Sequence, residues 1–94
     1  MSKYTRENLE RIETYIEVAY PDGDEILEEY DISYVSLENL LKVFIPEPED
    51  DYELVWAYAI NKEQSVLLNS FLKEPLDFDF TKFEYGMQRY GVYK

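Results

Sequence analysis

The side chains of this chain that could do chemistry are mainly carboxylates, and they gather in two short stretches. The first, DGDEILEEYD at residues 22–31, holds six acidic residues, and the second, EPEDDYE at residues 47–53, holds five. Acidic loops can bind calcium, and paired carboxylates can serve glycoside hydrolysis or magnesium-dependent reactions. Each of these chemistries requires a definite spacing, which the sequence allows us to check.

The calcium interpretation fails on the spacing of its ligands. With Gly23 at the sixth position of an EF-hand loop, Asp22 and Glu29 occupy the fifth and twelfth positions. The first and third positions, however, fall on Val18 and Tyr20, which carry no carboxylate. We therefore predict no metal site at this glycine turn.

The residue types that most enzymes use are missing. The chain has no histidine and no cysteine, and it contains no GxSxG or SxxK motif. Its three glycines, Gly23, Gly86 and Gly91, are too scattered for a phosphate-binding loop. Because 21 of the 94 residues are acidic, close pairs of carboxylates arise by chance. We expect a protein that is not an enzyme and that needs no cofactor.

The negative charge is confined to one half of the chain. Residues 12–61 hold fourteen acidic residues and a single basic one, Lys42, while the remaining segments almost balance, for a total charge of −12. Such crowding causes self-repulsion. It can serve as a solvated surface that keeps a small protein soluble, or as a docking surface that attracts a basic partner. Direct binding of nucleic acid is disfavoured by like-charge repulsion.

Composition predicts one folded domain over residues 1–94. Hydrophobic residues make up 46% and aromatic residues 17%, which is too much for a disordered chain. The absence of cysteine gives no indication of an oxidising compartment, and no apolar run resembles a signal peptide or a membrane span. We expect a cytoplasmic protein that does not contact the membrane.

The first half of the chain predicts a β-hairpin followed by a helix. Apolar residues alternate over residues 12–20 and 26–32, on either side of the PDGD turn. A helix from Thr5, with Leu9, Ile12, Ile16 and Ala19 as its stripe, is the competing interpretation, and residues 1–10 could be flexible or helical. The next segment, SLENLLKVFIP, predicts a helix of about ten residues that Ser36 caps.

The second half predicts a strand, a second helix and one or more final strands. YELVWAYAI at residues 52–60 is apolar on both faces, which is typical of a central strand. Asn61 and Gln64 form a capping-box pattern for a helix that turns Val66, Leu67, Phe71 and Leu72 inward. LDFDF and KFEYGMQRYGVY are β-prone. The order predicts an α+β fold: a mostly antiparallel sheet of about four to five strands with two helices packed on one face.

The ten tyrosines complete the pattern. Most are expected in the core, including those in the strand patterns: Tyr15, Tyr20, Tyr30, Tyr52 and Tyr58. Tyrosines beside carboxylates are also typical of protein-binding surfaces, where their rings supply area and cation–π contacts to arginine and lysine. On this ground Tyr30, Tyr34 and Tyr52 are candidate anchors.

The run DYELVWAYAINKEQSVLLNSFL, followed by LDFDFTKFEYGMQRY, resembles small bacterial immunity proteins of polymorphic toxin systems, including contact-dependent growth inhibition systems. The likeness covers roughly residues 10–93, and Gly86 departs from it where the family pattern has a large apolar or aromatic residue. The resemblance implies a protein that binds and neutralises one cognate toxin, and it assigns no interface residues.

We therefore predict an immunity protein whose acidic surface docks on a basic toxin domain, with an RNase or DNase as the first candidate, and blocks its active site. The predicted contact residues are Asp22, Asp24, Glu25, Glu28, Glu29, Tyr30, Tyr34, Glu47, Glu49, Asp50, Asp51, Tyr52 and Glu53. The alternative is an inhibitor of a restriction or CRISPR nuclease that mimics nucleic acid. A third possibility is a small carboxylate-dependent hydrolase, which Mg²⁺ or Ca²⁺ binding would reveal.

Overall fold

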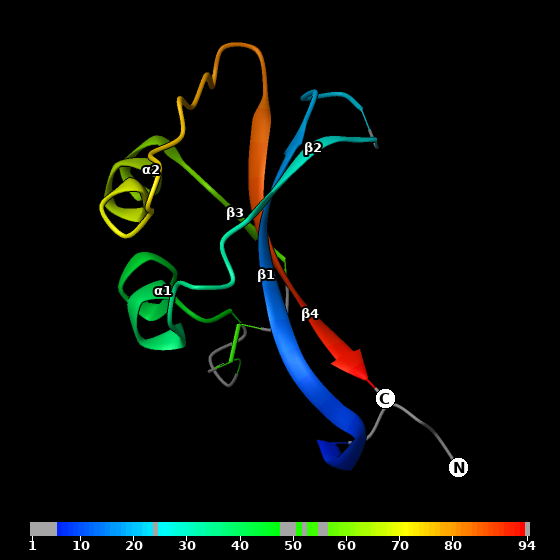
Figure 1. The fold of residues 1–94 in the computed structure, drawn as a ribbon. Helices are drawn as coiled ribbons and strands as arrows, with labels where there is room; N and C mark the ends of the chain where they lie inside the picture. Colours follow the sequence, from blue (N-terminus) through cyan, green and yellow to red (C-terminus); the bar gives the residue numbers. More distant parts are fainter. Residues whose placement is uncertain (1–5, 24, 48–50, 52, 55–56, 94) are drawn as a thin grey trace.

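An antiparallel sheet and two α-helices form the part of the chain that the structure describes (Figure 1). The structure is a computed structural model, and it describes residues 6–23, 25–47, 51, 53–54 and 57–93. The elements are a 3-10 turn (Arg6–Asn8), β1 (Leu9–Ala19), β2 (Ile26–Asp31), α1 (Leu37–Val43), β3 (Tyr58–Ala59), α2 (Lys62–Asn69) and β4 (Glu84–Tyr93).

The sheet has the strand order β2-β1-β4-β3, and its described strand pairs are all antiparallel. The two long strands β1 and β4 pair along nearly their whole length, from Leu9 opposite Tyr93 to Ala19 opposite Glu84. The short strand β2 pairs only with the second half of β1, after a turn in which the Gly23 amide donates to the Tyr20 carbonyl. The predicted hairpin is confirmed, and the competing helix from Thr5 is wrong.

Both helices lie on the same side of the sheet, which confirms the predicted α+β fold (Figure 1). Alternation along the strands turns one set of side chains toward them, so that Ile16 of β1 and Met87 of β4 are fully buried. They pack in one core with Leu40 and Phe44 from the α1 region and Leu68 of α2. Burying these apolar side chains is the main force that holds the helices on the sheet.

The helix starts follow the sequence closely. The Ser36 hydroxyl accepts a hydrogen bond from the Asn39 amide, and Asn61 and Gln64 form the reciprocal capping box. The ends differ more from the prediction. Helix α1 stops at Val43, after seven residues, because Phe44 is already extended two residues before Pro46. These caps fix where each helix begins.

Residues 52–60 do not form the predicted central strand. Only Tyr58–Ala59 is a strand, at the edge of the sheet, while residues 52, 55 and 56 lie outside the described part. Leu54 is fully buried but has a φ of 52°, a left-handed conformation that no strand residue adopts. Of the described apolar residues here, Leu54 and Ile60 are buried whereas Ala57 and Ala59 are exposed, so the segment is not a strand with two covered faces.

Two further expectations are wrong. Val66 and Leu67 of α2 are exposed, and the helix instead buries Ser65 and Leu68. The LDFDF segment forms no strand, since its phenylalanines Phe78 and Phe80 stack on each other and contact the Tyr85 ring edge-on. These rings are packed against one another although the segment that carries the two phenylalanines pairs with no strand.

Candidate functional site

Strand β2 divides the predicted contact residues between the two sides of the sheet. Glu28 and Tyr30 lie opposite Val18 and Ile16, the β1 residues that are buried on the helix side. The intervening residues Glu29 and Asp31 pair with Glu17 and Tyr15 and so belong to the other side. Every residue of β2 is exposed. The first acidic cluster therefore contributes to two surfaces.

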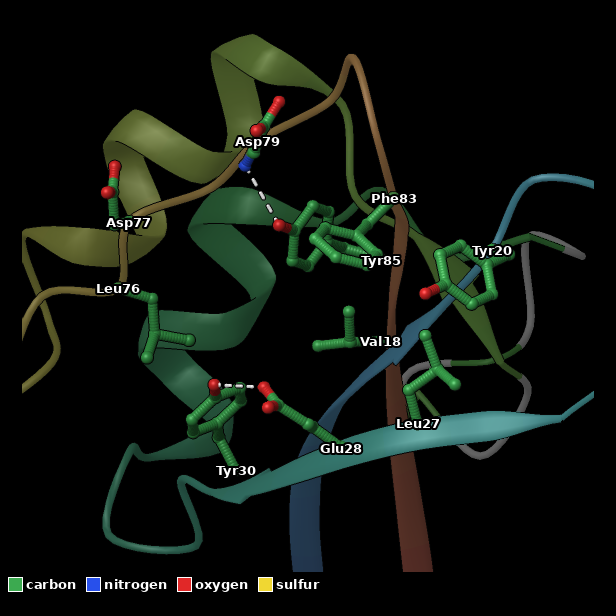
Figure 2. A pocket seen from close by; sticks show the side chains of 10 residues that line it. All are labelled: Val18, Tyr20, Leu27, Glu28, Tyr30, Leu76, Asp77, Asp79, Phe83 and Tyr85. Carbon is green, nitrogen blue, oxygen red and sulfur yellow. Dashed lines mark hydrogen bonds between the residues drawn. The ribbon is translucent and has the colours of Figure 1, made fainter.

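On the helix side, at the end of the sheet near the hairpin turn, there is an open groove of about 440 Å³ (Figure 2). We call it the aromatic groove. Its lining residues come from the hairpin and from the chain around the start of β4: Val18, Tyr20, Leu27, Glu28, Tyr30, Leu76, Asp77, Asp79, Phe83 and Tyr85.

Several aromatic rings and polar groups of the aromatic groove contact one another. The rings of Tyr20 and Phe83 are stacked with their centroids 5.6 Å apart, and Phe83 contacts Tyr85 edge-on. The Tyr30 hydroxyl donates a 2.5 Å hydrogen bond to Glu28, which raises the pKa of the tyrosine. Across the groove, the Asp79 amide donates to the Tyr85 hydroxyl at 2.8 Å. These contacts hold the polar groups of the groove in place.

The opposite side of the sheet is not covered by the described residues, and we call it the open face. Its side chains come from four strands, and each of them is partly or fully exposed: Arg11, Glu13, Tyr15, Glu17, Ala19, Glu29, Asp31, Ala59, Glu84, Gly86, Gln88 and Tyr90. Among them are five carboxylates and one basic side chain, Arg11.

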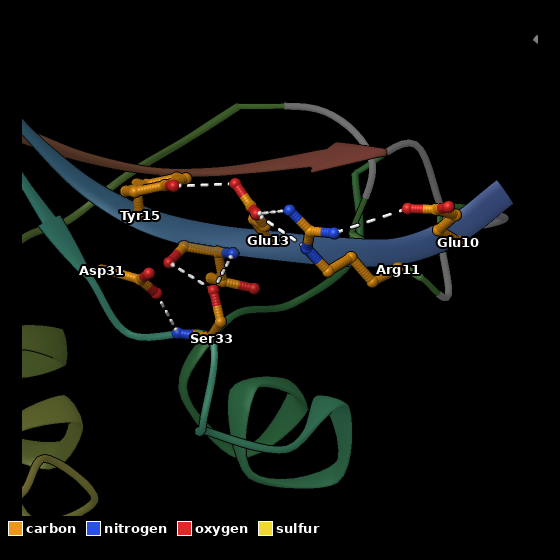
Figure 3. Close-up of polar contacts among 7 residues, drawn as sticks. Glu10, Arg11, Glu13, Tyr15, Asp31 and Ser33 are labelled. Atoms are coloured by element: carbon orange, nitrogen blue, oxygen red, sulfur yellow. Dashed lines mark hydrogen bonds and ion pairs between the residues drawn. The ribbon is translucent and has the colours of Figure 1, made fainter. Parts of the chain in front are cut away.

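Tyrosines and carboxylates are hydrogen-bonded to one another on the open face. The Tyr15 hydroxyl donates to Glu13 at 2.8 Å, and the same carboxylate accepts from the Arg11 guanidinium at 2.9 Å (Figure 3). Both bonds lower the pKa of Glu13, that from Tyr15 most strongly. The Tyr90 hydroxyl donates to Glu17 at 2.5 Å, and this bond raises the pKa of Tyr90 to about 12.

The hydrogen bonds join neighbouring strands into one surface. The rings of Tyr15 in β1 and Tyr90 in β4 meet edge-on, with centroids 5.9 Å apart. At the β2 edge, Asp31 accepts a 2.9 Å hydrogen bond from the Ser33 amide (Figure 3). The Ser33 side chain, and to a lesser extent this amide, lower the pKa of the Asp31 carboxyl. The open face is thus a polar surface whose side chains are linked across neighbouring strands.

Other predicted residues of the first cluster lie beside these two surfaces. Asp22 and Glu25 are exposed at the hairpin turn, whereas Asp24 lies outside the described residues. Tyr34 is exposed, but its hydroxyl accepts a hydrogen bond from the Lys73 amide at 2.9 Å, and the Lys73 ammonium lies 4.5 Å from its ring. Tyr34 therefore already contacts a lysine of its own chain.

The second acidic cluster lies at the other edge of the sheet, next to β3. Asp51 is only 4% exposed and accepts a 2.7 Å hydrogen bond from the Tyr58 hydroxyl, so it belongs to the interior and not to a docking surface. Glu47 and Glu53 are exposed, and the Glu53 carbonyl accepts a hydrogen bond from Arg89. Glu49, Asp50 and Tyr52 lie outside the described residues. The described residues of the two clusters lie at opposite edges of the sheet, near β2 and near β3.

Sequence reasoning missed several residues of both surfaces. Glu13, Tyr15 and Glu17 alternate with buried β1 residues, and this period of two could have revealed the open face. The aromatic groove had no comparable signal, since Tyr20 and Phe83 meet only through tertiary packing. The expectation that most tyrosines lie in the core is also wrong: of the eight tyrosines that the structure describes, none is fully buried.

The described residues show neither a cluster that could hold a metal ion nor a helix that could span a membrane. Within the described ranges, no three acidic side chains converge in a way that could hold a metal ion. Over the same ranges, no helix has the length and apolar character needed to cross a membrane.

A family model described as a domain of unknown function, DUF7683, matches residues 13–88. The chain belongs to the DUF7683 family. The matched segment contains β2, β3 and both helices, most of β1 and the first half of β4. It therefore includes every lining residue of the aromatic groove and most residues of the open face, but not Arg11 or Tyr90. No curated protein and no solved structure matches the chain.

Proposed function

We propose that this protein is an immunity protein that binds a basic toxin domain and neutralises it without catalysis. The observation that carries the proposal is the open face, where carboxylates from β1, β2 and β4 and the tyrosines Tyr15 and Tyr90 share one surface. Concentrated negative charge accelerates encounter with a basic protein, and tyrosine rings supply contact area with little loss of side-chain entropy.

A nuclease is the toxin class that fits this surface best. Enzymes that bind phosphates have positive clefts, so an acidic protein docked there excludes RNA or DNA from the active site. The resemblance to toxin-immunity proteins supports a toxin as the partner but does not identify its activity. A sheet surface also suits tight binding, because backbone pairing holds its side chains in place before the partner arrives.

The deciding experiment uses the protein encoded by the adjacent gene. This neighbouring protein is expressed in bacteria under three conditions: by itself, together with the native chain, and together with a Glu29→Lys/Glu84→Lys variant of the chain. The variant reverses two exposed charges on the open face. We expect growth arrest with the neighbour alone, rescue by the native chain, and loss of purified nuclease activity on addition of the native chain. The variant should rescue at a higher expression level only.

Two results would overturn the proposal. A neighbour that is harmless, or a toxic neighbour that this protein neither binds nor inhibits, would remove the immunity role. Binding to restriction or CRISPR nucleases without any dedicated partner would instead favour the nucleic-acid mimic.

A further inference from the structure

The aromatic groove has a chemical character that the open face lacks. Its walls include four rings and three aliphatic side chains, and Glu28, Asp77 and Asp79 also line it (Figure 2). The Glu28 carboxylate faces the hollow, whereas the Asp77 and Asp79 carboxylates turn away from it. No lysine or arginine is among its lining residues. An anionic ligand would be repelled there, and a neutral apolar ligand would leave the Glu28 carboxylate without a counter-charge.

We infer that the aromatic groove is a binding site for one arginine side chain of the partner protein. A guanidinium is planar and weakly hydrated, so it stacks on aromatic rings and accepts carboxylates as hydrogen-bond partners at the same time. A lysine ammonium is a compact, strongly hydrated charge, so it stacks less well on aromatic rings than a guanidinium does. The volume of about 440 Å³ also lies toward the lower end of the range of small-ligand sites, roughly 300–1,000 Å³.

Glu28 is the residue best placed to receive the guanidinium. The Tyr30 hydroxyl donates to one of its oxygens at 2.5 Å and so fixes the carboxylate at the groove wall (Figure 2). An ionised carboxylate offers about four acceptor positions, so this bond leaves capacity for guanidinium N–H groups. The stacked pair of Tyr20 and Phe83 provides a flat wall nearby. Tyr20 is 53% exposed, and hence accessible to a ligand.

The inference rests on the proposed function for one point only, the identity of the protein that carries the arginine. The groove itself can be tested without that protein. The probe is N-acetyl-L-arginine methylamide, titrated into the ¹⁵N-labelled chain while amide chemical shifts are recorded. Two related compounds serve as controls. The citrulline compound has nearly the same shape as the arginine compound but no charge, and the lysine compound has the same charge but no planar guanidinium group.

We expect saturable shifts from the arginine probe at amides of the groove, including Glu28, Asp79 and Phe83. The lysine probe should bind more weakly, and the citrulline probe should produce no saturable shift. Equal binding of citrulline, or arginine shifts centred on the open face, would overturn the inference.

Two neighbouring glutamates supply a matched pair of variants. Glu28→Gln should weaken the arginine probe by about tenfold, because a charge-assisted contact is lost. Glu29→Gln removes the same charge one residue away but on the open face, and it should leave the affinity within about twofold. Equal weakening by both variants would mean general attraction to an acidic chain and no groove site. Tyr20→Ala, which leaves every carboxylate in place, should also weaken the probe.

The results separate this inference from the proposed function. Arginine binding in the groove without neutralisation of the neighbouring protein would keep the site and remove the immunity role. Neutralisation of the neighbouring protein without arginine binding in the groove would keep the immunity role and remove the groove site.

Discussion

The aromatic groove and the open face are both acidic, yet they place their carboxylates in different surroundings. On the open face, Glu13 and Glu17 accept hydrogen bonds from Tyr15 and Tyr90 and are partly exposed on the side of the sheet away from the helices. In the groove, Glu28 and the aspartates line a hollow between rings and aliphatic side chains. Charge on a flat surface acts mainly on the rate of encounter, whereas charge beside rings in a hollow can select one side chain.

The difference arises within single strands. Glu28 and Glu29 are neighbours in sequence and similar in chemistry, but strand alternation places them on opposite sides of the sheet. The two sides then differ because both helices pack on only one of them. The core forms where the helices cover the sheet (Figure 1). The aromatic groove lies on the same side, near the hairpin turn, and no described residue covers the opposite side.

The largest expected effect tests whether the two sides of the sheet differ as the structure shows. Ile16→Ala should reduce the free energy of unfolding by about 2–5 kcal/mol, because it leaves a cavity at a fully buried position. Glu29→Gln, at an exposed position on the open face, should change it little. Urea denaturation of both variants measures the difference. Similar losses would contradict the assignment of a covered and an open side.

Matched charge reversals test which surface steers association. Glu29→Lys/Glu84→Lys on the open face and Glu28→Lys/Asp77→Lys in the groove change the net charge equally. We expect the open-face pair to slow association with a basic partner by about tenfold at low salt, and the groove pair to act mainly on dissociation. Stopped-flow association and dissociation rates at two salt concentrations provide the measurement. Identical rate profiles would show that only total charge matters.

The next prediction concerns alkaline pH and the open face. Because Tyr90 has its pKa raised to about 12, the folded state keeps this proton while the unfolded chain loses it near pH 10. Its contribution to stability is therefore complete below pH 10 and is lost as the pH rises toward 12. Glu17→Gln should bring the pKa of Tyr90 back toward 10, which ¹³C NMR of labelled tyrosine can follow. An unchanged pKa would contradict the role of Glu17.

The smallest expected effect lies at the groove. Hydrogen bonds from Thr81 lower the pKa of Asp79, so this aspartate stabilises the fold above its unfolded pKa, and that contribution is lost as the pH falls through the folded value. Thr81→Val removes the hydroxyl and should raise the pKa of Asp79. The Asp31 carboxyl on the open face should titrate as before, and NMR titration of both carboxyl groups provides the test.

Several features of this protein were fixed by local rules that the sequence displays. The hairpin followed from period-two alternation around PDGD, and both helix starts followed from caps that act over three residues. The α+β class followed from the order of these elements. The concentration of acid in residues 12–61 was likewise visible without a structure.

Only the tertiary structure decided which acidic residues share a surface. Asp51 belongs to an acidic run in the sequence, but it is buried and accepts a hydrogen bond from the Tyr58 hydroxyl. Leu54 has a left-handed backbone conformation in a segment whose composition is typical of a strand. Tyr20 and Phe83 are distant in the chain and meet across the sheet to form one wall of the groove. Alternation, capping and charge density act over a few residues, whereas burial and the shape of a groove depend on which distant segments pack together.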